Sequence, residues 1–272
     1  MRGKRTRRWL SVTGLLVALT GVGLAAPGTA AAAPIPGLAR HAFTVPGGAG
    51  FAAATVSCPT PHVVYGLGGE IHNGNGEVHM VSLLPNAALT AVTVIAAPRV
   101  APVAPWRLTA YAICGRDVPA TPHLEVNPVA SWVDVETCNG ASRLYGTGAR
   151  QTGGPAATLR EMVPNAPAFP PIAVRASVNP PAGAPGVAAA AICGIPQPTL
   201  HSIVAPAAGF GSTVTCPAGE LVHGTGGLVP GVNPNIVFEG IVPNLALTQV
   251  RVTARNGGTG LPEPTVAFAV CA

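Results

Sequence analysis

Three evenly spaced pairs of cysteines constrain the fold of this 272-residue chain more than any other feature. The pairs span 56, 55 and 55 residues, and they are Cys58 with Cys114, Cys138 with Cys193, and Cys216 with Cys271. Each second cysteine ends a run of small residues, as in YAICG, AAICG and FAVCA. Self-similarity at a fixed period is the signature of a repeat architecture. The spacing therefore predicts three copies of one unit of about 79 residues.

Other landmarks recur in the same register. A Gly-x-Gly pair follows each first cysteine by eight and ten positions, and these pairs begin at Gly66, Gly146 and Gly224. A strand rather than a helix is expected after each pair, so we interpret it as a β-bulge or a close backbone crossing and not as a phosphate site. We expect a short N-terminal segment over 33–40, followed by copies over 41–120, 121–199 and 200–272.

The pattern within each copy is that of β-strands. Residues 249–255 alternate apolar with polar side chains, which is typical of a half-buried strand. Similar short runs are bounded by Pro, Gly and Asn, and they cover 62–71, 78–85, 90–97 and 106–114. We predict an all-β fold. The copies could form independent beads, but the joints between them are short, which favours a closed pseudo-threefold arrangement such as a β-prism.

The first 32 residues have the layout of a secretory signal peptide. The basic stretch MRGKRTRR precedes an apolar stretch, and small residues suited to cleavage follow. Thr6-Arg7-Arg8 also resembles a twin-arginine signal, so general secretion and twin-arginine export both stay open. The alternative is a retained membrane anchor, because the apolar stretch could nearly span a bilayer. We expect a secreted or envelope-associated protein without a membrane span after cleavage.

Charge and composition narrow the possible partners. Five of the 15 Lys and Arg residues lie in the leader, which leaves ten Arg against ten Asp and Glu. A mature chain with no net positive charge lacks the electrostatic footprint of a nucleic-acid-binding protein. Charged residues make up 9% of the chain, against about 25% in ordinary domains. A weakly charged surface favours association with an envelope component, a glycan or a second copy.

Six cysteines in an exported chain predict three disulfides. Pairing within each copy gives Cys58–Cys114, Cys138–Cys193 and Cys216–Cys271, and it would make each copy a self-contained, stapled unit. Pairing across the joints, with Cys58–Cys271 closing the ring, is the alternative. We favour the first pattern because it works for any copy alone. No cofactor is predicted, since the cysteines lack the spacing of a zinc site.

Two sets of histidines are candidate metal sites. His72, Glu77 and His79 flank an Asn-Gly turn and could hold a divalent cation, although an exposed polar hairpin tip is the simpler interpretation. His41, His123 and His201 occupy similar places in the three copies and would converge only if those places faced a common axis.

Catalysis finds little support in the sequence. The chain lacks a Gly-x-Ser-x-Gly elbow, a Walker loop, a dinucleotide fingerprint and an HExxH motif. Its acidic residues are scattered, and only Glu161 and Glu239 share a position counted from the first cysteine of their copies. Phe51, Trp132 and Phe210 recur upstream of those cysteines as possible ligand contacts, but we interpret them first as core aromatics.

Two resemblances follow from the repeat. The pattern Cys-Pro-x-Gly-x-x-x-x-Gly-x-Gly from Cys216 to Gly226, with the Pro-Asn pairs and the run from Trp106 to Cys114, resembles exported repeat proteins of actinobacteria whose function is uncharacterised. The stretch from Thr44 to Phe51, followed by Cys58-Pro59, is similar to the vitelline membrane outer layer protein, a threefold β-prism. That resemblance implies an envelope or sugar-binding role.

These observations lead to two expectations for function. The first is a non-enzymatic structural or interaction protein of the cell envelope or extracellular space. The second is a lectin-like protein with up to three equivalent carbohydrate sites.

Overall fold

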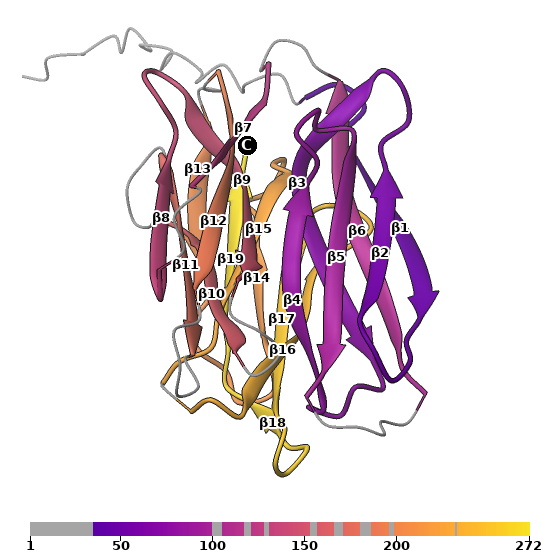
Figure 1. Cartoon of the computed structure of the whole chain (residues 1–272). Coiled ribbons are helices and arrows are strands. Elements are labelled where there is room, and N and C mark those ends of the chain that lie inside the picture. The colour runs from indigo at the N-terminus through magenta and orange to yellow at the C-terminus, as the bar shows by residue number, and fades with distance from the viewer. Residues whose placement is uncertain are drawn as a thin grey trace, which may run out of the picture. The chain divides into compact units, whose positions relative to one another are not determined.

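The structure of this chain is a computed structural model. It describes residues 35–99, 105–116, 121–127, 131–152, 157–165, 171–179, 186–195, 199–231 and 233–272, so the predicted leader lies outside the described residues. All regular elements in this part of the chain are strands, numbered β1 to β19 and gathered in three sheets (Figure 1). The predicted all-β fold is confirmed, and Ala188–Ala191 lies within a strand.

The three sheets are entirely antiparallel. Sheet A has seven strands, which are β1 (Ala39–Pro46), β6 (Arg107–Arg116), β3 (His62–His72), β16 (Ile236–Pro243), β17 (Gln249–Asn256) and β14 (Ser212–Thr215), with β18 (Pro262–Glu263) beside β17. Sheet B has six strands, which are β2 (Ala52–Ser57), β5 (Ala91–Pro98), β4 (Val78–Pro85), β9 (Arg143–Gln151), β12 (Val187–Gly194) and β7 (His123–Val126). Sheet C also has six, which are β13 (His201–Val204), β19 (Val266–Cys271), β15 (Val222–Leu228), β10 (Thr158–Pro164), β11 (Ala173–Asn179) and β8 (Val133–Thr137).

Strand order shows that each predicted copy contributes to two sheets. A copy gives its first, last and third strands to one sheet and its fourth, fifth and second strands to another. Sheet A thus joins the first copy to the third, sheet B joins the first to the second, and sheet C joins the second to the third. The alternative of independent beads is therefore wrong. A closed threefold arrangement such as a β-prism stays a prediction, and this strand order agrees with it.

All six cysteines form disulfides in the predicted within-copy pattern. The paired Cα atoms lie 5.6, 5.5 and 5.8 Å apart. Each bond joins the turn after a second strand in one sheet to a last strand in another, as Cys58 after β2 is joined to Cys114 in β6. The disulfides consequently tie together sheets A and B, B and C, and C and A. Contrary to the expectation, the stapled copies are not self-contained units.

The third strands β3, β9 and β15 meet in the core in successive layers. Three rings form the first layer, three glycines the second and two threonine-to-backbone hydrogen bonds the third. The layers consist of Tyr65, Tyr145 and His223, then Gly66, Gly146 and Gly224, then Leu67, Thr147 and Thr225. Because consecutive residues of each strand meet their counterparts in order, the three strands run side by side in one direction.

Glycine is required at the second layer because the backbones touch there. A Cβ atom on Gly66 would lie 2.1 Å from the carbonyl oxygen of His223, and one on Gly146 would lie 2.3 Å from that of Tyr65. Such distances are far below van der Waals contact. The register of β3 with β6 also shifts between Val64 and Gly66. The Gly-x-Gly pair is therefore both a β-bulge and a close crossing, as predicted.

Candidate functional site

The three recurring aromatics lie at the surface, immediately before the second strand of each copy. Their exposed fractions are 65% for Phe51, 55% for Trp132 and 80% for Phe210, so the interpretation as core residues is wrong. They precede β2, β8 and β14, each of which is the last strand at one end of its sheet. A strand at that place has a hydrogen-bonded neighbour in the sheet on one side only.

The three aromatics leave the sheets at the same end. Strands β1 and β3 are both antiparallel to β6, so they run in the same direction. The same relation links β7 to β9 through β12, and β13 to β15 through β19. Because β3, β9 and β15 run side by side in one direction, β1, β7 and β13 finish at the same end of their sheets. Phe51, Trp132 and Phe210 lie between these strands and the strands that follow them.

A network of polar side chains covers the first-copy half of the solvent-facing side of sheet A. The Tyr111 hydroxyl donates to Glu70 Oε2 at 2.6 Å, and His72 Nε2 lies 3.7 Å from the same oxygen and 2.8 Å from Thr109 Oγ1. The Arg40 guanidinium lies 4.9 Å from the centre of the Tyr111 ring. Burial, assisted by the hydrogen bond to Glu70, raises the pKa of Tyr111. Its hydroxyl therefore stays protonated and holds the carboxylate in place.

The third-copy half of this face carries a second fixed carboxylate. Arg255 Nε donates to Glu239 Oε2 at 2.7 Å, while Glu239 Oε1 accepts the backbone N–H of Gly76 at 3.1 Å. Arg255 Nη1 also donates to the Gly260 carbonyl at 2.8 Å. Two further hydrogen bonds, one to each partner, thus hold the ion pair in place, so that its side chains lose little conformational entropy when a ligand binds.

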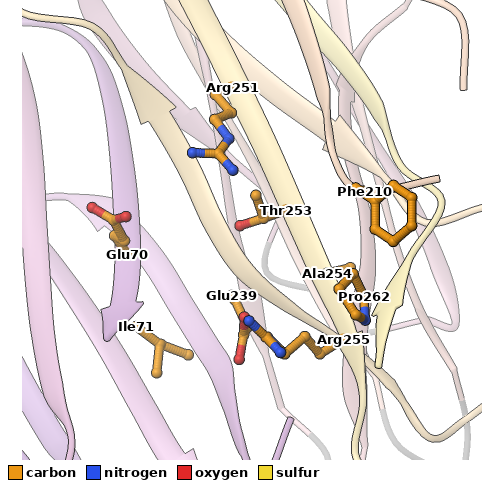
Figure 2. Close-up of a pocket in the computed structure, with 9 residues that line it drawn as sticks. All are labelled: Glu70, Ile71, Phe210, Glu239, Arg251, Thr253, Ala254, Arg255 and Pro262. Carbon is orange, nitrogen blue, oxygen red and sulfur yellow. The ribbon is translucent and has the colours of Figure 1, made fainter. Parts of the chain in front are cut away.

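A pocket of about 240 Å³ lies between the two halves (Figure 2). Its lining residues are Glu70, Ile71, Phe210, Glu239, Arg251, Thr253, Ala254, Arg255 and Pro262. In Figure 2, Arg251 and Thr253 point from β17 toward the side on which Glu70 lies, while Phe210 stands beside Pro262. Among the described residues, none forms a hydrogen bond or ion pair with the exposed side chain of Arg251. Its guanidinium donors are free for a ligand.

The corresponding faces of sheets B and C differ from this one. Register places Arg150 and Leu228 where sheet A has Glu70. Sheet C has a smaller pocket of about 180 Å³, in which Arg175 lies 3.4 Å from Glu161. The described positions of sheets B and C that correspond to Glu70 therefore carry no carboxylate.

Strand register also corrects the expected equivalence of Glu161 and Glu239. Glu161 pairs with Ser177 in the ladder between β10 and β11. Glu239 instead occupies the bulge of β16, between the paired residues Phe238 and Gly240. The second copy is one residue shorter between its first cysteine and its Pro-Asn pair, which shifts the count.

Neither histidine cluster forms a group of three metal-ligating side chains among the described residues. His72 belongs to sheet A and contacts Glu70, whereas His79 is buried in β4 of sheet B, and Glu77 precedes β4. Burial, with repulsion from Arg99, lowers the pKa of His79 to about 4.

The second histidine set lies on first strands of three different sheets. His41, His123 and His201 are in β1, β7 and β13. His123 lies 3.5 Å from Glu125, and His201 lies at the same distance from Glu220.

The buried ring cluster of Tyr65, Tyr145 and His223 was not identified from the sequence. The ring centres lie 5.4 to 6.2 Å apart. Each ring belongs to the residue before the first glycine of the Gly-x-Gly pair, in YGLG, YGTG and HGTG. A ring at this position in all three copies is the sequence signal that could have predicted the cluster. Burial lowers the pKa of His223 to about 4, which leaves it neutral in the core.

Comparisons with known proteins add no assignment. The described part of the chain has no helix that is long and apolar enough to cross a membrane. No protein-family model matches the chain, and no curated protein is similar to it in sequence.

Proposed function

We propose that this chain is an exported, non-enzymatic binding protein of the cell envelope or extracellular space. It attaches to an extended envelope polymer through Phe51, Trp132 and Phe210. The observation that carries the proposal is the exposure of these aromatics, at equivalent places and at one end of the sheets. Exposed aromatic side chains are costly to leave in water and are typical anchors of binding surfaces.

Two further features support this proposal. Three disulfides in an all-β chain fit an extracellular protein, because such bonds persist in oxidising compartments. Three equivalent contacts on one rigid scaffold suit a ligand with a repeating structure, since each contact after the first is intramolecular and adds avidity. A polymer of the envelope provides such repetition.

Sedimentation with insoluble envelope material from the producing organism tests the proposal. We expect the intact protein to sediment with this material. Each single replacement of Phe51, Trp132 or Phe210 by alanine should weaken binding about 5- to 30-fold. The variant with all three replacements should stay in solution. Phe43→Ala is the matched control, because Phe43 is 52% exposed but lies within β1. Sedimentation of the triple variant at the level of the intact protein would refute the aromatic contacts. Hydrolysis of the polymer would refute the non-enzymatic role.

A further inference from the structure

We infer that the pocket on sheet A binds one uncharged sugar unit of that polymer, an inference that rests on the proposed function and names its ligand. The charge of the pocket is the first reason. Glu70 and Glu239 balance Arg251 and Arg255, so the lining has no net charge. An anionic ligand would lie beside two carboxylates and a cationic one beside two guanidiniums, and each juxtaposition is unfavourable. A neutral ligand meets neither cost.

The second reason is the mixture of hydrogen-bonding groups. Glu70 can only accept, and Tyr111 holds it in place. Arg251 can only donate, and its donors are free, while the Thr253 hydroxyl can do both. A ligand that satisfies all three needs neighbouring groups that both donate and accept. Vicinal hydroxyls of a sugar ring have this property.

The third reason is an apolar surface at the rim. Phe210 is 80% exposed and lines the same pocket as the four charged side chains. A sugar ring has faces made of C–H groups, and stacking one on Phe210 would remove apolar area from water. The pocket, at about 240 Å³, is below the range of about 300–1,000 Å³ for drug-sized ligands, so it suits a single sugar unit.

An array of immobilised oligosaccharides tests this inference on the full-length, disulfide-bonded protein. The probes are neutral oligosaccharides of glucose, galactose, mannose and N-acetylglucosamine, with sulfated and uronic acid oligosaccharides for comparison. We expect binding to at least one neutral probe. Arg251→Ala and Glu70→Gln should each weaken that binding about 10- to 100-fold, because the first removes charged hydrogen-bond donors and the second replaces a charged acceptor by a neutral one. Arg107→Ala is the matched control, since Arg107 is an exposed arginine of sheet A outside the pocket.

Binding to no neutral probe, a preference for the charged oligosaccharides, or unchanged binding by both pocket variants would each overturn the inference. Thermal unfolding of every variant, with the disulfides intact, excludes loss of fold as the cause of lost binding. Envelope sedimentation separates the two proposals. If Arg251→Ala and Glu70→Gln sediment like the intact protein while the triple aromatic variant does not, the sugar pocket is wrong and the aromatic attachment stands. If the triple variant also sediments like the intact protein, the aromatic attachment fails as well, and failure of the intact protein to sediment would overturn the proposed function itself.

Discussion

Acid should destabilise this protein, and His223→Phe should remove a defined part of that effect. The His223 ring is fully buried, 6.2 Å from the Tyr65 ring and 5.8 Å from the Tyr145 ring. Burial lowers its pKa from 6.5 to about 4, an effect that the Ala272 carbonyl offsets in part. Between these two pH values the unfolded chain binds a proton that the folded chain does not. The free energy of unfolding therefore falls as the pH falls through this window, and the loss is complete below about pH 4.

The size of the effect follows from the difference in pKa between the two states. At about 1.36 kcal/mol per pKa unit, His223 should reduce the free energy of unfolding by about 3 kcal/mol on acidification. Phenylalanine keeps an aromatic ring in the cluster and does not titrate. His79 has a similarly lowered pKa and lies in sheet B, so its contribution should add independently.

Guanidinium unfolding at about pH 7 and about pH 4, with the disulfides intact, measures this effect. The acid-induced loss of stability should be about 3 kcal/mol smaller in His223→Phe than in the intact protein. The variant His79→Gln provides a comparison in which a different buried imidazole is removed. An acid-induced loss in His223→Phe equal to that of the intact protein would refute the assignment of a neutral histidine to the core.

Three further substitutions test the core and the links between sheets. Gly66→Ala places a Cβ atom 2.1 Å from a carbonyl oxygen, so it should lower the free energy of unfolding in urea by more than about 3 kcal/mol. Gly48→Ala is the control, because a Cβ atom there has nothing within 4 Å, and it should change that free energy by about 0.5 kcal/mol or less. Replacing Cys138 and its partner by serine should lower the free energy of unfolding by about 2–5 kcal/mol, and an unchanged transition would contradict a role for the bond that joins sheets B and C. Asp134 accepts the Ala189 backbone N–H at 2.7 Å from a different sheet, so Asp134→Ala should cost about 1–3 kcal/mol and weaken hydrogen-exchange protection of that amide.

The strands and the disulfides could be predicted because their signals are local or repeated. Alternation at 249–255 set the faces of β17, and it is reproduced by buried Val250 and Val252 beside exposed Arg251. The cysteine spacing recurred three times, which reduced the plausible pairings to two.

The surface aromatics show where pattern alone fails. Aromatic residues are buried more often than not, so the sequence pattern favours a core position for Phe51 and Phe210. Their exposure depends on which strands end a sheet, and that depends on pairing between strands far apart in the sequence. β2 and β14 end their sheets, and Phe51 and Phe210 lie immediately before these two strands.

The pocket on sheet A could not be predicted for a related reason. Its two carboxylates come from β3 and β16, which pair in the sheet although Glu70 and Glu239 belong to the first and third copies. Neither residue recurs in the other copies at the corresponding ladder position. A site built from residues in which the copies differ leaves no recurring signal in the sequence.

Each sheet is built from strands of two copies, and this has a consequence for how the chain folds during synthesis. Sheet A pairs β3 with β16, so its central ladder cannot form until most of the chain has been made. Contacts this distant in sequence give a high contact order, which slows folding. A nascent chain that ends near residue 199 would leave β3 and β10 with bare hydrogen-bonding edges, which are templates for aggregation. Early closure of the Cys58–Cys114 disulfide would reduce the conformational freedom of the first copy until the third copy has been synthesised.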